Sequence, residues 1–514
     1  MEAGTNARKI DRRAWLLFGG FASLKIAIHV LTNGHGPYGY FRDELYYLDC
    51  VGHLGGGYVD QPPLSIFILA ATRFLLGDSM TAIRLPVVLA GAVAVVLAGL
   101  IVRAAGGGRF AQAVACLSVL AMPVAMTMGS FFSMNAFDQL FWALGAYLLL
   151  RLIQTDDRRL WLWFGLVAGL GLENKLSMAF FGMGLVAAMA ATPLRRHFLD
   201  RRFWLGGGIA AVLFLPHVVW QAGHGWPTVE FMRNARLFKN MPTPLVKFFL
   251  GQVILVGPAN APLWIAGLLY GVFSKQRRTL AAFSILYVAV FAVFFLTNGK
   301  VYYLSPAYPM LLASGALAVE RAVANRSWAK PAIVGFLGLG GLVVAPLAMP
   351  LLPVPMFLRY QQALGLRAPQ EERTHSGPLP QHLGDRLGWE EFVAMTANAF
   401  GALPPEDHAR CSIFVSNYGE AGAIDLFGPR FGLPRAISGH MTHYLWGPGD
   451  ATGEVMLVYW DDRRGLEALF REVTEVARFH HPYVMDRQND RPLYLCRGLT
   501  VPIAEAWKRV KAYR

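Results

Sequence analysis

Long apolar segments separated by short polar connections dominate the first two thirds of this chain. Each segment is continuously apolar over about 20 residues, which is the length at which an α-helix crosses the hydrocarbon core of a bilayer. A transmembrane β-barrel would instead alternate apolar and polar residues. The pattern therefore predicts a polytopic α-helical membrane protein with about eleven transmembrane helices. The expected spans are residues 14–31, 82–104, 110–129, 134–153, 160–171, 176–192, 203–221, 245–271, 279–297, 302–320 and 331–353.

Composition supports this class. Hydrophobic residues make up 55% of the 514 residues and charged residues only 16%, whereas about a quarter of a soluble protein is charged. The net charge of +14 does not indicate a nucleic-acid partner, because most Lys and Arg residues form short clusters between apolar segments. Such clusters set the topology of a membrane protein, so the expected partner is the lipid bilayer.

The distribution of charge also predicts the topology. Arg8, Lys9, Arg12 and Arg13 precede a first segment that is longer than a signal-peptide core and contains Lys25 and His29, so an uncleaved anchor with a cytoplasmic N-terminus is expected. Basic residues then recur in every second connection, at 103–109, 151–159, 195–202, 275–278 and 321–330. The other connections, including a long first loop at 32–80, are expected outside, as is the C-terminal region.

The C-terminal region changes character after a Pro-rich exit at residues 350–355. We predict a transmembrane domain at 1–355 and a small extracytoplasmic α/β domain at 356–514. The expected strands are Cys411–Ser416, Glu454–Trp460 and Arg491–Cys496, and the expected helices are Glu420–Phe427 and Arg464–Phe479. Cys411 and Cys496 both fall in this domain, and the sequence leaves open whether they pair or stay as two thiols.

An adjacent acidic pair, Asp43-Glu44, is the sharpest candidate site. Neighbouring residues on a helix point about 100° apart, so one carboxylate can face a reacting hydroxyl while the other holds a substrate group or metal. That arrangement suits abstraction of a proton from an acceptor hydroxyl. Two solvated loop charges are the alternative, but the aromatic neighbours, Tyr46 among them, favour function. Aromatic rings suit sugar faces, although interfacial aromatic belts give the same composition.

A second acidic block, Asp60-Gln61-Pro62-Pro63, follows in the same loop. Each Pro restrains itself and its predecessor, so Asp60 is expected to be held beside the Asp43 segment. A simple helix start at Pro63 explains the same residues equally well.

Single cations and polar residues at the outer ends of spans are the remaining candidates. Lys175 and Lys300 can bind a phosphate as point charges, although snorkelling is the ordinary role of such lysines. Arg233 and Arg236 can surround a lipid phosphate or belong to a solvated basic loop. Further candidates are Asn135 and Asp138 at the start of a span, where Asp138 also suits helix capping. In the C-terminal region, Ser416–Glu420 suits either a ligand at a strand end or helix capping.

With these residues in hand, the chain resembles the C-type glycosyltransferases that use polyprenyl-phosphate sugars. It is most similar to the bacterial branch that contains protein O-mannosyltransferases and the lipid A aminoarabinose and galacturonic acid transferases. The matching blocks are Arg42–Tyr47, Tyr58–Leu64, Ser133–Asp138, Gly169–Lys175 and Lys300-Val301-Tyr302-Tyr303. They cover about residues 30–310 in order and spacing, and they add Tyr302 and Tyr303 to the substrate-binding candidates.

The resemblance implies the C-type glycosyltransferase fold and inverting transfer of a sugar from a polyprenyl monophosphate to a cell-envelope acceptor, at the outer face of the bacterial cytoplasmic membrane. It implies Asp43 as general base, Glu44 as a contact to the acceptor and Lys175 as the group that neutralises the leaving phosphate. Gln61 stands where aminoarabinose transferases carry Lys, so that donor is not specified. No cofactor is implied, and the sequence neither establishes nor excludes a divalent cation.

Two other functions fit a polytopic chain. A secondary transporter or flippase would place ionisable residues or broken helices near the bilayer midplane, and Lys25, Pro258 and Pro262 are hints of that kind. A non-catalytic envelope assembly protein would depend on residues 376–514 rather than on Asp43.

Overall fold

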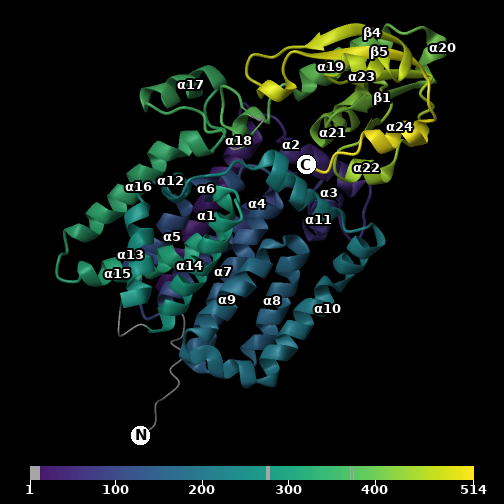
Figure 1. Ribbon diagram of the computed structural model, residues 1–514. Helices are drawn as coiled ribbons and strands as arrows, with labels where there is room; N and C mark the ends of the chain where they lie inside the picture. The colour runs from purple at the N-terminus through teal and green to yellow at the C-terminus, as the bar shows by residue number, and fades with distance from the viewer. Residues whose placement is uncertain (1–11, 274–277, 371, 374–375) are drawn as a thin grey trace. The chain divides into compact units, whose positions relative to one another are not determined.

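The computed structural model describes residues 12–273, 278–370, 372–373 and 376–514 (Figure 1). The predicted cytoplasmic cations Arg8, Lys9, Lys275 and Arg277 lie outside these ranges. The chain folds as two compact units. Unit 1 consists of Met1–Gly36, Leu76–Leu215 and Thr243–Leu351, and unit 2 of Pro37–Leu75, Pro216–Pro242 and Leu352–Arg514.

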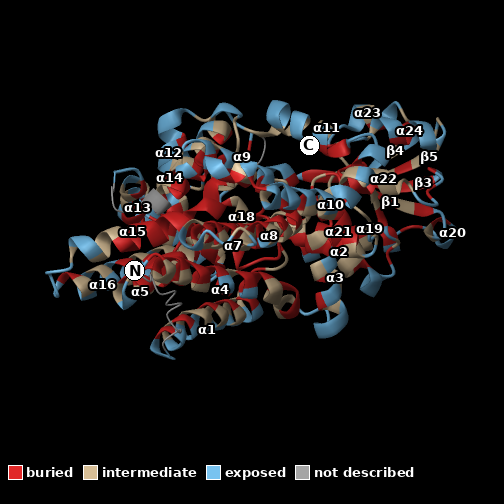
Figure 2. Ribbon diagram, turned by 90° about the horizontal axis from the view of Figure 1, so that it is seen from below, coloured by how far each residue is buried: buried red, intermediate tan, exposed pale blue. Residues whose placement is uncertain are grey.

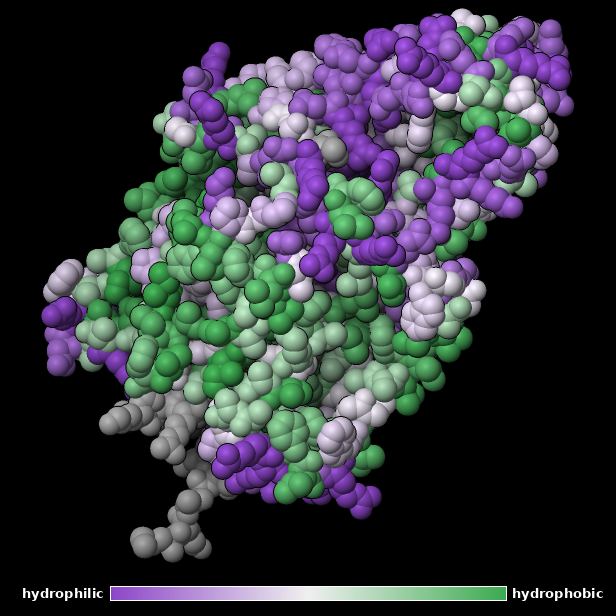
Figure 3. Space-filling model, viewed as in Figure 1, coloured by the Kyte–Doolittle hydropathy of each residue, from purple (hydrophilic) through white to green (hydrophobic). Residues whose placement is uncertain are grey.

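Unit 1 is entirely helical in its described part. Its α-helices are α1 (Arg12–His35), α4 (Met80–Ala104), α5 (Arg109–Leu120), α6 (Pro123–Met128), α7 (Met134–Thr155), α8 (Leu160–Asn174), α9 (Ser177–Ala190), the first part of α10 (Arg201–Gly223), α12 (Leu245–Val256), α13 (Ala261–Phe273), α14 (Arg278–Leu296), α15 (Tyr308–Ala322) and α16 (Ala329–Ala348). A 3₁₀ turn, Val301–Ala307, precedes α15. Apolar side chains gather on the surface of these helices (Figure 3), as expected for contact with lipid.

The multi-pass helical class is confirmed, but the number of spans is not settled at eleven. Within the described ranges, five helices are long and apolar enough to cross a membrane, and up to seven spans result if each of two bent helix pairs counts as one. The pairs, α9 with the 3₁₀ turn Pro193–Leu199 and α12 with α13, each bend by 111°. Every predicted span contains helix, but several are short or broken. Pro123, for example, opens α6 after a break from α5, because proline lacks the N–H that continues a helix.

Three polar residues of α1, each one helical turn from the next, form hydrogen bonds to backbone carbonyls of the short helix α6 and its C-cap Gly129. Lys25 Nζ donates to the Ala125 carbonyl at 2.8 Å, the His29 ring lies 3.1 Å from the Met126 carbonyl, and Asn33 donates to the Gly129 carbonyl at 3.0 Å. Helix ends leave carbonyls without helical partners, and an unpaired carbonyl is costly inside a membrane protein. The intramembrane Lys25 therefore has a structural role here.

We expect His29→Leu to lower the stability of the protein by about 1–3 kcal/mol, since the Met126 carbonyl would be left buried without its partner. Thermal unfolding in detergent measures the loss. The control is Leu31→Val on the exposed face of the same helix, which should change the melting temperature little. Equal melting temperatures for His29→Leu and the control would contradict this role.

Unit 2 combines helices near residues 42–76 with a C-terminal α/β domain. The former are α2 (Arg42–Val51) and α3 (Leu64–Leu76). The sheet has five strands in the order β2-β1-β3-β5-β4. The strands are β1 (Cys411–Val415), β2 (Ala436–Ser438), β3 (Val455–Tyr459), β4 (Phe470–Phe479) and β5 (Arg491–Leu499). β2, β1 and β3 are parallel, whereas β5 is antiparallel to both β3 and β4. The predicted small α/β domain is present, and hydrophilic side chains cover its surface (Figure 3).

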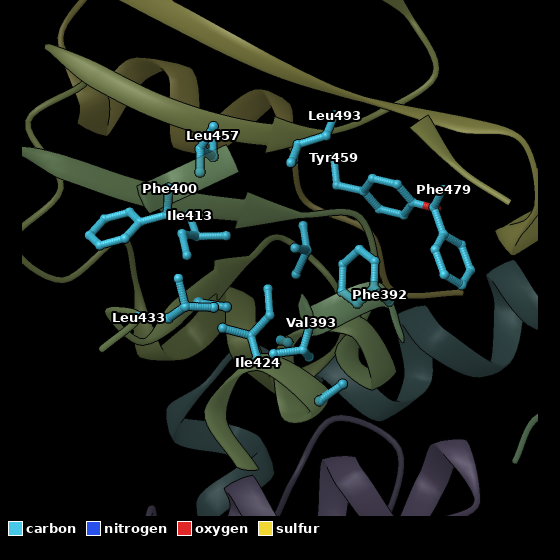
Figure 4. Close-up of a cluster of buried hydrophobic side chains, with 14 of the residues drawn as sticks. Phe392, Val393, Phe400, Ile413, Ile424, Leu433, Leu457, Tyr459, Phe479 and Leu493 are labelled. Atoms are coloured by element: carbon cyan, nitrogen blue, oxygen red, sulfur yellow. The ribbon is translucent and has the colours of Figure 1, made fainter. Parts of the chain in front are cut away.

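The core of the domain lies between this sheet and two helices, α19 (Trp389–Gly401) and α21 (Tyr418–Phe427). Buried residues follow β1, β3 and the first part of β5 (Figure 2), whereas most residues of β4 are exposed or half-buried. Figure 4 shows Phe392 and Val393 of α19 and Ile424 of α21 directed toward strand residues such as Ile413 and Leu457. The other face of the sheet packs Phe414 and Val458 near Trp507 of α24 (Ile503–Arg509).

One predicted helix of the domain is absent from the described part of the structure, and the structure decides whether the two cysteines of the domain pair. The predicted helix Arg464–Phe479 is wrong: a short helix α23 (Arg463–Glu467) is followed by the edge strand β4. The charged residues of β4 are compatible with an edge strand, where they face solvent and oppose aggregation. Cys411 and Cys496 are buried free thiols. They lie on β1 and β5, with β3 between, so two strand spacings of about 4.8 Å each separate them, beyond disulfide reach.

Candidate active site

The adjacent carboxylates at the start of α2 have different environments. Glu44 is fully buried, and its Oε2 accepts the Phe41 backbone N–H at 2.8 Å, which satisfies the N-cap N–H at the start of the helix. The Asp43 side chain keeps 32% of its surface exposed. The pair therefore diverges as the helical geometry predicts, with Asp43 toward solvent and Glu44 inward. The structure gives Glu44 a capping role, and its contact to an acceptor stays a prediction.

Asp43 is held by one hydroxyl and one guanidinium. Tyr418 Oη donates to Asp43 Oδ1 at 2.8 Å. Arg42 Nε lies 3.8 Å from the same oxygen and 3.7 Å from Asp385 Oδ2, with its guanidinium 5.4 Å from the centre of the Tyr418 ring. Burial acts to lower the pKa of Arg42, but Asp385, Tyr418 and Asp43 outweigh it and raise that pKa above its ordinary value. The cation beside Asp43 is thus permanent.

Asp60 is joined to α2 through Tyr46. Tyr46 Oη donates to Asp60 Oδ1 at 2.8 Å and lies 2.5 Å from Thr442 Oγ1. Thr442 Oγ1 also accepts the Val59 backbone N–H at 3.0 Å. Burial raises the pKa of Asp60 to about 6, against the opposing effect of the Tyr46 hydrogen bond. The structure therefore brings Asp60, Tyr46 and Asp43 into one polar cluster, as the sequence predicts for a rigid segment beside α2.

Gln61 is an unusual member of this region. Its side chain is fully buried, and neither the oxygen nor the nitrogen of its amide has a hydrogen-bond partner among the described residues. An unpaired buried polar group costs about 1–3 kcal/mol. The unpaired amide of Gln61 therefore lowers the free energy of unfolding. Such a cost is typical of a residue that binds a ligand.

We expect Gln61→Leu to raise the melting temperature while lowering sugar transfer, because Leu removes the unpaired amide and with it any contact to substrate. Thermal unfolding and the sugar content of the envelope measure the two effects. Gln362→Leu, on the exposed side of helix α17 (Val354–Ala363), is the control. A lower melting temperature with unchanged transfer would assign Gln61 to packing.

Arg233 and Arg236 lie in unit 2 but apart from this cluster. Arg233 belongs to α11 (Pro227–Asn234), and Arg236 to the π-helical turn Ala235–Lys239 that follows. Both side chains are exposed. No hydrogen bond or ion pair within the described ranges links either arginine to Asp43 or Asp60. Exposed apolar residues surround them, including Met232, Leu237 and Phe238, which suits a segment at a lipid surface.

A second cluster, in unit 1, unites candidates from three separate stretches of sequence. Lys175 follows α8, and its Nζ donates to Asn135 Oδ1 at 2.6 Å and lies 3.6 Å from Asp138 Oδ2. Ser177 Oγ donates to Asp138 Oδ1. The same Nζ lies 5.7 and 5.3 Å from the ring centres of Tyr302 and Tyr303, and Lys300 Nζ lies 6.0 Å from the Tyr302 ring.

This arrangement concentrates positive charge against aromatic rings. Two lysines, Lys175 and Lys300, lie near the Tyr302 ring. Asp138 forms an ion pair with Lys175, so it does more than cap α7, whose N-cap is Ser133. Two neighbouring lysines suit a phosphate or another anion.

Sequence reasoning missed several members of these clusters. Tyr418 and Thr442 contact Asp43 and Tyr46 from positions almost 400 residues away in the chain, and Ser177 lies just beyond a matching block. For the Ser416–Glu420 segment, capping is confirmed: Asn417 caps α21, and Glu420 completes the capping box. Among the described residues, no group of three or more His, Cys, Asp or Glu side chains could hold a metal ion.

Comparison with known proteins supports the resemblance. Residues 60–220 match the family model described as dolichyl-phosphate-mannose-protein mannosyltransferase. Two curated relatives are the lipopolysaccharide core galacturonosyltransferases RgtA and RgtB of Rhizobium johnstonii, each 26% identical over 220 and 252 residues. The matches cover 42% and 47% of this chain, and they span only 43% and 45% of RgtA and RgtB.

The fold is also that of a solved glycosyltransferase. Structures of ArnT from Cupriavidus metallidurans, one apo and one bound to undecaprenyl phosphate, each superpose with a TM-score of 0.58 at 16% identity. They cover 94% of this chain and 98% of the ArnT chain. The family model, the two relatives and the ArnT-like fold together support the C-type glycosyltransferase superfamily. The protein is a multi-pass membrane protein.

Proposed function

We propose that this protein transfers a sugar from a polyprenyl-monophosphate donor to a hydroxyl of a cell-envelope lipid, glycan or protein, with inversion at the anomeric carbon. The observation that carries the proposal is the Asp43 carboxylate, partly exposed at the start of an otherwise buried helix and held by Tyr418 and Arg42. The relatives that modify the lipopolysaccharide core support the class of acceptor. The undecaprenyl phosphate of the ArnT structure supports the class of donor.

The reaction needs a base and a stabilised leaving group. Asp43 takes the proton of the acceptor hydroxyl as its oxygen forms a bond to the anomeric carbon. The bond from that carbon to the phosphate oxygen breaks, and its electron pair leaves with the lipid phosphate. Lys175 and Lys300 stabilise the charge that develops on this phosphate. Asn135, Asp138, Tyr302 and Tyr303 orient the two lysines.

The remaining candidates have supporting roles in this proposal. Asp60 and Tyr46 shape the sugar side of the acidic cluster, Gln61 contacts the donor, and Arg233 and Arg236 attract the lipid phosphate at the membrane surface. Glu44 positions Asp43 by capping α2. No cofactor takes part, and a divalent cation bridging carboxylate and phosphate is compatible with the scheme.

We also propose the topology that the charges predict: a cytoplasmic-membrane protein with a cytoplasmic N-terminus, a transmembrane domain at 1–355 and an extracytoplasmic domain at 356–514. Its support is that the basic connections fall on one side of the predicted spans and the candidate residues on the other.

Comparative mass spectrometry of envelope lipids, glycans and proteins tests the proposal in wild-type, deletion and Asp43→Asn strains. A sugar that is missing from the deletion strain, and is restored by the wild-type gene but not by Asp43→Asn, is the expected result. Unchanged glycosylation in all three strains would favour the transporter alternative. That alternative has lost one of its hints, because Lys25 serves the carbonyl of Ala125.

A further inference from the structure

The C-terminal domain makes an intimate contact with the helix that carries Asp43. Helix α21 packs on α2 at two glycines that lie one turn apart. A Cβ atom on Gly419 would collide with the Arg42 side chain, and a Cβ atom on Gly422 would lie 2.5 Å from the Leu45 carbonyl oxygen. Because side-chain atoms are absent at these positions, the start of α21 reaches the start of α2, and Tyr418 comes within hydrogen-bond distance of Asp43.

Three polar residues on one face of α2 each meet a side chain of this domain. Asp43, Tyr46 and Asp49 are spaced by three residues, so they share a helix face. Tyr418 contacts Asp43 at 2.8 Å, Thr442 contacts Tyr46 at 2.5 Å, and His443 Nε2 lies 3.0 Å from Asp49 Oδ2. The domain thus fixes α2 at three points along its length.

Tyr418 is itself fixed by the domain. Its ring stacks on His440 with 4.8 Å between centres and an angle of 2°. Its backbone N–H donates to His440 Nδ1 at 3.3 Å, and His440 Nε2 lies 2.8 Å from the Arg514 carbonyl oxygen. Burial raises the pKa of Tyr418 well above its ordinary value, so the hydroxyl stays protonated and donates a hydrogen bond to the Asp43 carboxylate.

We propose that the C-terminal domain completes the candidate active site through Tyr418, a positioning residue that orients the Asp43 carboxylate. The catalytic consequence of this inference rests on the proposed function, whereas its structural content does not. The charged and titratable groups that face Asp43 are Arg42 on its own helix, Tyr418 on α21 and, through electrostatic interaction, Tyr47 and Asp60. Among the described residues, Tyr418 donates a hydrogen bond to Asp43 from outside α2.

The test measures the Asp43 carboxyl group without any substrate. The full-length protein in detergent is treated with a water-soluble carbodiimide and an amine between pH 5 and 8, and mass spectrometry measures the labelled fraction of Asp43. Carbodiimides react with a carboxyl group that they can reach, and the Tyr418 hydroxyl occupies one oxygen of Asp43. In Tyr418→Phe, that oxygen loses its hydrogen-bond donor, and labelling of Asp43 at a fixed pH should rise roughly tenfold. Labelling of the exposed Asp450 should not change.

Matched variants separate positioning from general damage. Tyr483→Phe, in the connection between β4 and β5, is the control for loss of a tyrosine hydroxyl. Gly422→Ala keeps Tyr418 but pushes α21 from α2, so it should reproduce the labelling shift of Tyr418→Phe. Gly401→Ala is its control, since a Cβ atom there meets nothing within 4 Å.

Sugar transfer gives the second readout. Tyr418→Phe should lower transfer roughly 10- to 100-fold, the effect of losing one hydrogen bond to a charged group. Unchanged Asp43 labelling in both Tyr418→Phe and Gly422→Ala would overturn the inference, whatever the activity. A labelling shift without any wild-type sugar transfer would uphold the positioning contact and reject the proposed function.

Discussion

The Asp43→Asn protein is expected to lose roughly 100- to 10,000-fold of its transfer activity, the usual contribution of a general base. Asn has nearly the same shape as Asp, and its amide oxygen can still accept a hydrogen bond from the Tyr418 hydroxyl. It cannot, however, remove a proton from the hydroxyl of the acceptor substrate. Since the Asp43 side chain is partly exposed, the melting temperature should change little. Sugar incorporation into the envelope and thermal unfolding of the purified protein measure the two quantities.

The control for Asp43→Asn is Asp450→Asn, which removes an exposed carboxylate from the same unit. It should match the wild type in both activity and melting temperature. Transfer by Asp43→Asn at more than a tenth of the wild-type rate would eliminate Asp43 as the base. A large fall in its melting temperature would instead mean that its charge stabilises the fold beside Arg42.

The sequence predicts the residues of both clusters better than it predicts the contacts among them. The order of apolar segments predicts a helical region that the structure shows in each expected span, and short motifs alone point to Asp43, Lys175 and the Lys300–Tyr303 block. Pairing of Asp138 with Lys175, however, depends on how two helices meet, and a motif does not state this. Tyr418 lies 375 residues from Asp43 in the sequence. Gly419 and Gly422, which allow α21 to approach α2 closely, have no sequence feature that marks them as contact residues.

The local sequence pattern predicts the wrong secondary structure where strand pairing determines the conformation. The charged and apolar residues of Arg464–Phe479 suit an amphipathic helix, but pairing with β5 makes Phe470–Phe479 the edge strand of the sheet. The spans illustrate a related limit. Apolar length predicts where helices occur, whereas breaks such as the bend between α12 and α13 require backbone partners supplied by other helices.

Replacement of Lys175 is the prediction with the next largest effect. Lys175→Met should lower transfer by about 100- to 1,000-fold, because in the proposed mechanism it removes a positive charge that stabilises the leaving phosphate. The same change also leaves Asp138 buried without its cation: the Asp138 side chain is only 2% exposed. Breaking a buried ion pair in this way costs roughly 3–5 kcal/mol. Low activity of this single variant would therefore not distinguish phosphate binding from loss of structure.

The double variant Lys175→Met/Asp138→Asn makes that distinction. Asn at 138 can still accept the Ser177 hydroxyl, and it removes the unpaired charge, so the melting temperature should return most of the way to the wild-type value. If Lys175 serves the phosphate, transfer stays low in this stable protein. Lys175→Arg, which keeps a cation but changes its shape, should retain intermediate activity. Recovery of transfer in the double variant would show that Lys175 acts only as the partner of Asp138.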